Sequence, residues 1–362
     1  MGADRREARQ AGLRASMAAG GLDGLLVQSL PNIRYLTGFT GSSALLLVGA
    51  AELVLVTDFR YETQAAREAG RAARVEIDRS SVWQRLKRVM AERPRHAVGF
   101  EAHVATVQDR GRLDELGADS WLPVEGMVEA LRAIKDPEEV AAIRVAASLA
   151  QEALAETLPG VKVGETELAV AARLEAALRV RGSEWHPFPT IVASGPRSAL
   201  PHARTSGREL ARGDLLLLDF GAQVDGYCAD LTRVAVVGTQ ADERQLAIHG
   251  LVAQAQARAL GGLRAGLTGR EGDALARDLI TQRGHGDAFG HSLGHGLGLE
   301  VHEAPRLAAT ADGVLPAGAV VTVEPGIYLP GWGGIRLEDD VLLTEAGAEL
   351  LSDNRVDLLA IA

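Results

Sequence analysis

The chain has very few cysteines, no long apolar run and no surplus of basic residues. Cys228 is its single cysteine, so no disulfide can form within the chain, which favours a reducing compartment. The charged N-terminus has no apolar stretch, so we expect a cytoplasmic protein without a secretory signal. The longest apolar run, residues 44–56, contains Glu52 and is too short to cross a membrane. The net charge of −10 argues against binding to nucleic acid.

The length and the order of sequence patterns predict two domains. A chain of 362 residues exceeds one comfortable core and suits two domains of roughly 100–200 residues each. Residues 22–101 alternate strand-like and helix-like segments, which is typical of an α/β domain. Asp136 and Pro137 then provide the N-cap and first turn of a long helix. We place the domains at 1–132 and 133–362, and the second mixes helices with antiparallel-looking strands, an α+β pattern.

Two aspartates lie in strand-like segments on either side of a tight turn. Asp225-Gly226 is typical of a two-residue hairpin loop, which would place Val224 opposite Tyr227. Because strand side chains alternate, Asp219 and Asp230 would then lie on one face, diagonal to each other. Two interpretations stay open at this point: a solvated pair of acids, or a pair that holds a cation.

Histidines and glutamates accumulate further along the chain. His291, His295 and His302 lie in a glycine-rich segment, where the absence of side chains lets imidazoles converge. Glu324 ends an apolar strand-like segment, and Glu338 lies in another, two residues after Arg336. Glu338 either forms a salt bridge with Arg336 or belongs to a larger site whose negative charge Arg336 offsets.

This set of oxygen ligands with at least one imidazole predicts a metal site. Such ligands suit Mn²⁺, or else Co²⁺, Fe²⁺ or Zn²⁺. Four carboxylates exceed the need of one divalent ion and suit two ions roughly 3.5–4 Å apart. A pair of this kind supports metal-assisted hydrolysis. Cys228 lies in a strand-like segment beside Asp230, where a thiolate is disfavoured, so it is not interpreted as a nucleophile.

Four segments in order, "DFG…GYCADLTR", "HSLGHGLGLEVHE", "VEPGIY" and "GIRLEDD", resemble the pita-bread metallopeptidases, the family of aminopeptidase P, prolidase and methionine aminopeptidase. "NIRYLTGFTGSSALLL" and "TDFRYETQA" resemble the creatinase-type N-terminal domain of the proline-specific members. The resemblance implies an α/β creatinase-like domain followed by an α+β pita-bread domain, a curved antiparallel sheet covered by helices. It also implies a homodimer.

The resemblance carries residue roles onto matching positions. It implies five metal ligands: Asp219, Asp230, His295, Glu324 and Glu338. Glu324 would also be the general base, His302 would stabilise the intermediate or move a proton, and His202 would contact the scissile region. It adds His291 on the prolyl side, and we place Arg336 with the three histidines among the substrate-binding residues. The choice of His295 over His291 as ligand depends on the resemblance alone.

The implied substrate is a peptide with proline at its second position, cut at the Xaa–Pro bond. A prolidase must bind a free carboxylate, for which arginine is suited. In the segment 303–324 the only arginine is Arg306, nearer to His302 than the prolidase pattern has it, and Thr310 occupies the expected place. We therefore predict an Xaa-Pro aminopeptidase. The alternative is an Xaa-Pro dipeptidase in which Arg34 or a partner subunit supplies the arginine. A binding module without activity is the third interpretation, disfavoured because all five ligand positions are intact.

Overall fold

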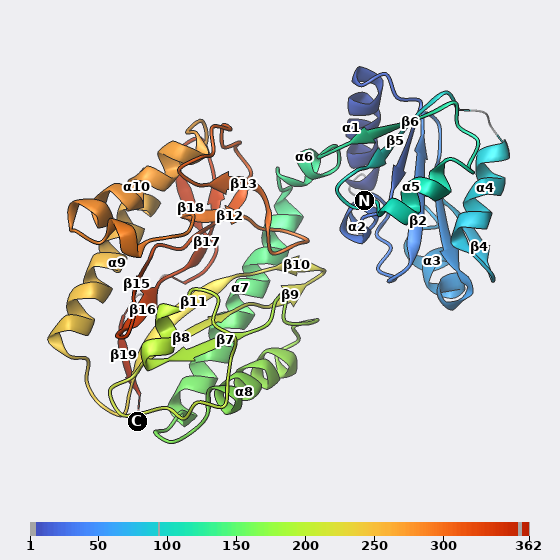
Figure 1. Cartoon of the computed structure of the whole chain (residues 1–362). Helices are drawn as coiled ribbons and strands as arrows, with labels where there is room; N and C mark the ends of the chain where they lie inside the picture. Colours follow the sequence, from blue (N-terminus) through green and yellow to red (C-terminus); the bar gives the residue numbers. More distant parts are fainter. Residues whose placement is uncertain (1–4, 93–94, 354–356, 362) are drawn as a thin grey trace. The chain divides into compact units, whose positions relative to one another are not determined.

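The computed structural model describes residues 5–92, 95–353 and 357–361. Its contacts divide the chain into two compact units, Met1–Arg132 and Ala133–Ala362, coloured blue to teal and green to red in Figure 1. Among the described residues, none of the helices combines the length and apolarity that crossing a bilayer requires.

The first unit is an α/β sandwich around one mixed sheet, as predicted. Its strands are β1 (Gly24–Val27), β2 (Ala44–Gly49), β3 (Leu53–Asp58), β4 (Arg74–Asp78), β5 (Ala97–Glu101) and β6 (Ser120–Val124). Its helices are α1 (Arg5–Ala19), α2 (Leu30–Thr37), α3 (Glu62–Glu68), α4 (Val82–Glu92), α5 (Val107–Leu113) and α6 (Glu129–Arg132). The strand order is β4-β3-β2-β1-β5-β6, with β2 antiparallel to both neighbours and the remaining pairs parallel.

The second unit contains the motifs that the sequence singles out. Its helices are α7 (Pro137–Thr157), α8 (Glu167–Val180), α9 (Glu243–Gly262) and α10 (Gly269–Gln282). Its early strands are β7 (Ile191–Ser194), β8 (Leu215–Phe220), β9 (Gln223–Val224), β10 (Tyr227–Cys228) and β11 (Leu231–Val237). Its later strands are β12 (Gly294–Gly296), β13 (Glu303–Leu307), β14 (Val320–Val323), β15 (Gly326–Leu329), β16 (Gly333–Arg336), β17 (Asp339–Leu343), β18 (Ala348–Leu350) and β19 (Leu359–Ile361).

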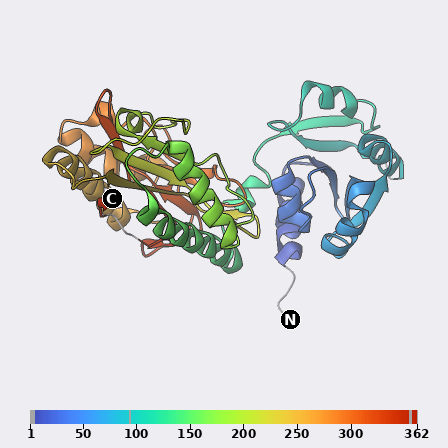
Figure 2. The same cartoon turned by 90° about the horizontal axis from the view of Figure 1, so that it is seen from below.

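Two sheets form the centre of this unit, in the orders β19-β11-β8-β7 and β13-β12-β14-β17-β18. Among the described residues, the strand pairings within these sheets are antiparallel, as predicted, except that of β19 with β11, which is parallel. An isolated bridge between Thr232 and Glu338 connects the two sheets. Figure 2 shows α7 and α8, in green, lying side by side over the strands.

The alternation of β8 explains where Asp219 lies. Leu216, Leu218 and Phe220 pack in a core with α7 and α8. Leu215 and Leu217 pack in a second core with α9, α10 and the later strands. Asp219 has the parity of Leu215 and Leu217, so its carboxylate lies on the face that meets β14 and β17.

The hairpin predicted at Asp225-Gly226 is confirmed. Tyr227 pairs with Val224, and both loop residues have positive φ, +50° at Asp225 and +78° at Gly226. This combination is the turn that matches the twist of the flanking strands. The same register continues into β8 and β11, where Thr232 lies opposite Asp219.

Candidate metal centre

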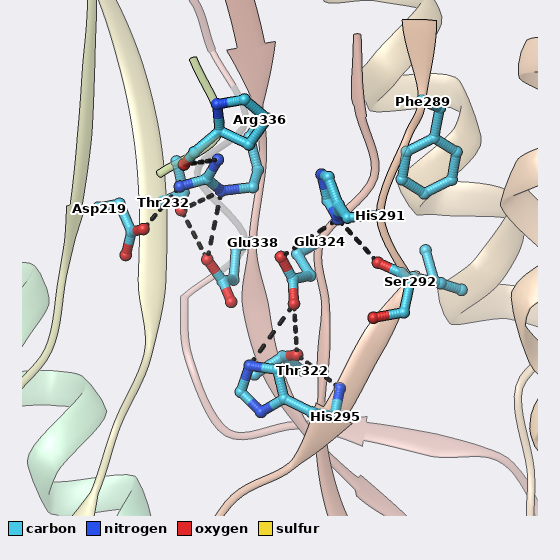
Figure 3. A network of polar contacts seen from close by, with 12 residues as sticks. Asp219, Thr232, Phe289, His291, Ser292, His295, Thr322, Glu324, Arg336 and Glu338 are labelled. Atoms are coloured by element: carbon cyan, nitrogen blue, oxygen red, sulfur yellow. Dashed lines mark hydrogen bonds and ion pairs between the residues drawn. The ribbon is translucent and has the colours of Figure 1, made fainter. Parts of the chain in front are cut away.

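Five acidic and imidazole side chains converge where strands of the two sheets begin or end, and Figure 3 labels four of them, Asp219, His295, Glu324 and Glu338. Asp219 lies in β8, Asp230 precedes β11, and Glu338 precedes β17. His295 lies in β12, and Glu324 follows β14. The bridge between Thr232 and Glu338 brings the two halves of the site together, although those residues lie more than a hundred positions apart in the chain.

Ligand atoms of this group lie at distances that one metal ion can span. Asp230, His295 and Glu338 each offer one such atom, and these atoms lie within 4.8 Å of one another. His295 Nε2 lies 3.7 Å from Asp230 Oδ2 and 3.5 Å from Glu324 Oε1. Asp219 is buried beside them, and its Oδ2 accepts a hydrogen bond from Arg336.

The surroundings of His295 leave one ring nitrogen facing the carboxylates. Its Nδ1 lies 3.0 Å from the carbonyl oxygen of Gly296, a partner that accepts the Nδ1 proton and leaves Nε2 without one. Burial lowers the pKa of His295 to about 4, so the ring is neutral, the form that binds metals. The strand that carries His295 can approach Thr322 this closely only because residue 294 is glycine. A Cβ at that position would lie 1.9 Å from the Thr322 carbonyl oxygen.

The carboxylates of the centre are buried together, and hydrogen-bond donors of the protein do not reach all of their oxygens. Asp219 Oδ1 and Asp230 Oδ1 have no hydrogen-bond partner among the described residues. Burial raises the pKa of Asp219, Asp230 and Glu324, and for Asp230 and Glu324 the neighbouring Glu338 raises it further. Burial also raises the pKa of Glu338 to about 7. Bound cations would reverse all of these costs, so the residues present fit a divalent metal centre.

Arg336 contacts several parts of the centre at once. Its Nη2 donates to Asp219 Oδ2 over 2.6 Å, whereas its Nε lies 3.8 Å from Glu338 Oε2. Thr232 Oγ1 accepts from Arg336 Nε and donates to Glu338 Oε2 over 2.6 Å. The salt bridge of Arg336 with Glu338 is therefore weaker than its salt bridge with Asp219. A role of Arg336 in binding substrate stays a prediction.

His291 has protein partners on both ring nitrogens. Its Nδ1 lies 2.8 Å from the Ser292 carbonyl oxygen, and its Nε2 lies 2.9 Å from the Tyr328 hydroxyl. That hydroxyl accepts a hydrogen bond from Arg336 Nη1, so its proton is directed to His291. Arg336, Tyr328 and His291 thus form a chain at the edge of the centre, and the substrate contact of His291 stays a prediction.

The other two histidines are exposed. His302 packs its ring against His295 with 4.3 Å between ring centroids. Burial lowers the pKa of His302, and the charge of the nearby His202 lowers it further. His202 lies in the loop that follows the short helix η3 (Gly195–Ala199). Both side chains are thus accessible, and their contacts with a substrate and their roles in the reaction stay predictions.

Several residues of the centre were missed from the sequence. Thr232 holds Glu338 and Arg336, Asp340 accepts the backbone N–H of Asp230 over 3.1 Å, and Thr322 donates to Glu324. Thr232 could have been found, because the predicted hairpin register places it opposite Asp219. Thr322 lies only two residues before Glu324, whereas the contact of Asp340 joins segments far apart in sequence. Cys228 is buried, and burial raises the pKa of its thiol, which agrees with the absence of a nucleophilic role.

Comparisons with known proteins place this geometry in a family. Residues 141–345 match metallopeptidase family M24, and residues 9–134 match the creatinase/prolidase N-terminal domain. The chain belongs to metallopeptidase family M24. It is thus an enzyme of the pita-bread fold with a creatinase-type N-terminal domain, as the resemblance implies.

Several similar proteins in this family are named as proline-specific peptidases. The Xaa-Pro dipeptidase of Pyrococcus furiosus is 35% identical over 341 residues, 93% of this chain and 95% of that protein. The structure of an Xaa-Pro dipeptidase from Bacillus anthracis is 38% identical with a TM-score of 0.94, covering 98% of this chain and 99% of that one. That of an X-Pro aminopeptidase from Thermotoga maritima is 37% identical with a TM-score of 0.88, covering 94% and 98%.

Proposed function

We propose that this M24 metallopeptidase is an Xaa-Pro dipeptidase, a prolidase, that hydrolyses dipeptides with proline second. This replaces the aminopeptidase prediction by its alternative, because similar proteins over nearly the whole chain are dipeptidases of this type. The observation that carries the proposal is the position of Arg306. It pairs with His295 across β12 and β13, and its side chain is exposed.

The pairing of Arg306 with His295 explains how Arg306 can bind the free carboxylate of a dipeptide. Side chains directly opposite on antiparallel strands share a face, with Cβ atoms roughly 4.5–5.5 Å apart. Besides burial, the charge of Arg306 lowers the pKa of His295, as expected for a guanidinium close to that ring. The proposal therefore assigns to Arg306 the free carboxylate of a dipeptide whose scissile bond lies at His295. The sequence prediction looked for this arginine near Thr310, which lies in a turn after β13.

The proposed metal ligands are Asp219, Asp230, His295, Glu324 and Glu338, holding two divalent ions, with Mn²⁺ the first choice. Such ions polarise a carbonyl and supply a hydroxide nucleophile at neutral pH. The chain's own residues supply the remaining steps. Glu324 takes the proton of the attacking water, and His302 holds or delivers a proton at the edge of the site. His202 contacts the substrate near the scissile bond.

A second candidate is Xaa-Pro aminopeptidase activity on longer peptides, which the similarity to the X-Pro aminopeptidase from Thermotoga maritima favours. The two are separated by measuring kcat/KM with Mn²⁺ for an Xaa-Pro dipeptide and an Xaa-Pro-Yaa tripeptide. We expect hydrolysis of the dipeptide, and a loss of about 10–100-fold in its kcat/KM in Arg306→Ala, mostly through KM. Arg270→Ala, which removes an exposed arginine paired with Asp312, is the control. Preference for the tripeptide, with no effect of Arg306→Ala on the dipeptide, would support the aminopeptidase.

Two further parts of the proposal concern the protein in the cell. A cytoplasmic location is supported by the single, buried cysteine. A homodimer is supported by the family resemblance, and light scattering of the purified protein tests it.

A further inference from the structure

Glu167 is a carboxylate buried outside the metal centre. It is the first residue of α8 and has no exposed surface. A buried carboxylate is costly unless donors surround it. The side-chain oxygens of Glu167 accept hydrogen bonds from both ends of one loop, residues 194–206, and from Arg197 within it, and this loop carries His202.

Both oxygens of Glu167 are saturated by that loop. Oε1 accepts the backbone N–H and the hydroxyl of Ser194, each over 2.8 Å. Oε2 accepts the backbone N–H of Ser206 over 3.0 Å and its hydroxyl over 2.6 Å. The Nε of Arg197 lies 3.2 Å from both oxygens. One side chain thus closes the loop by holding its first and last residues.

The middle of the loop is attached to the strands of the metal centre. Ser198 Oγ accepts the backbone N–H of Gly334 in β16 over 2.9 Å. The carbonyl oxygen of Pro201 accepts from Arg336 Nη1 over 3.3 Å, and Arg336 also holds Asp219. His202 follows directly. The backbone around His202 is therefore held by Arg336 of the metal centre at Pro201 and by Glu167 at Ser206.

We propose that Glu167 is a positioning residue, which acts on hydrolysis by fixing the loop that presents His202 to the substrate. The inference rests on the proposed function, because it requires that His202 contacts the substrate. Glu167→Gln keeps the shape of the side chain, but its NH₂ group faces donors that need an acceptor. The loop ends are then no longer held together, and His202 is placed less well.

A double-mutant cycle separates this role from a general loss of stability. We expect Glu167→Gln to lower kcat/KM for an Xaa-Pro dipeptide by about tenfold or more, and by less than about twofold when His202 is already alanine. Glu139→Gln is the matched control: Glu139 is also buried near the start of a helix, accepts from Tyr227 and touches neither loop end. Its effect should be the same with and without His202. Equal effects of Glu167→Gln in both backgrounds, or full activity of His202→Ala, would overturn the proposal.

Hydrogen exchange tests the anchor without activity. In Glu167→Gln the amides of Ser194 and Ser206 should exchange at least about tenfold faster, while amides in α9 keep their protection. If Glu167→Gln does not fold, Ser206→Ala, which removes one donor and leaves the carboxylate, replaces it in both experiments. Unchanged exchange at both serines would overturn the anchoring role. If the wild-type protein cleaves no Xaa-Pro peptide while exchange responds as expected, the proposed function fails and the anchor stands.

Discussion

Arg336 Nη2 lies 2.6 Å from Asp219 Oδ2, and both side chains are buried. The guanidinium therefore compensates a carboxylate that also belongs to the proposed metal ligands. Removing one partner of a buried pair leaves the other uncompensated, at a cost of about 3–5 kcal/mol. A cation at Asp219 would take over part of this compensation.

We expect Arg336→Met to lower the free energy of unfolding by about 3–5 kcal/mol in chelator, and by clearly less with saturating Mn²⁺. Urea denaturation under both conditions measures the difference. The control Arg270→Met removes an exposed pair and should cost no more than about 1 kcal/mol under either condition. An equal loss with and without metal would mean that no cation acts on Asp219.

Asp230 and Glu324 are the carboxylates whose loss should be most damaging to catalysis. Asp230→Ala removes a proposed metal ligand, and Glu324→Ala removes both a proposed ligand and the proposed general base. We expect either change to lower kcat by at least about 10²–10⁴-fold, since general base catalysis alone contributes that much. The fold should survive, because each change relieves repulsion among buried acids. Steady-state kinetics and circular dichroism check this, with Asp312→Ala as an exposed control. Retained turnover in either variant contradicts the ligand assignment.

Part of this site follows from the sequence because the hairpin is local. The Asp225-Gly226 turn fixes the register, and the register places Asp219, Asp230 and Thr232 beside each other. Glu324 and Glu338 were likewise recognisable from residue type and strand context, whereas the choice of His295 over His291 depended on the family resemblance. The N-terminal α/β order was also predictable, although α1 and α2 were not, because helices in charged or short segments depend on tertiary packing.

What could not be predicted depends on contacts between distant segments. The position of Arg306 opposite His295 follows from the β12–β13 pairing, whose register shifts between His295 and Gly296, and counting residues from His302 could not give it. The contact of Asp340 with Asp230 joins β17 to the residue before β11, two strands that belong to different sheets. The sequence pattern also predicts a helix over residues 81–93 that Pro94 ends; the structure has α4 there, and the predicted end lies outside the described residues.

Metal binding should weaken as the pH falls. Burial raises the pKa of Glu338 to about 7 and that of Asp230 above its usual range, so protons compete with the cation for these oxygens. Because the pKa of Glu338 is higher in the folded protein than its ordinary value of 4.5, protonation of Glu338 stabilises the metal-free fold. This stabilisation is complete at a pH below 4.5 and is lost as the pH rises through about 7. We therefore expect a higher apparent Kd for Mn²⁺ at pH 6 than at pH 8, with protons released on binding. Calorimetry in two buffers of different ionisation enthalpy measures both quantities. An affinity that is the same at both pH values would contradict the prediction.

Lys135 and Glu303 form an ion pair with side chains only 1% and 6% exposed, and Glu303 directly follows His302. Lys135 Nζ donates to Glu303 Oε2 over 3.2 Å, which ties the start of the second unit to the segment that carries His302. We expect Lys135→Met to cost about 3–5 kcal/mol of unfolding free energy, because Glu303 loses this partner in a buried place.

The double variant Lys135→Met/Glu303→Gln should cost less than the sum of the two single variants, by about 1–3 kcal/mol, because the second change removes the charge that the first leaves behind. Urea denaturation of the four proteins measures this coupling. The exposed pair Arg144–Glu349 provides the matched control, for which we expect a coupling below about 1 kcal/mol. Additive costs for Lys135 and Glu303 would mean that their contact contributes nothing of its own to holding the His302 segment.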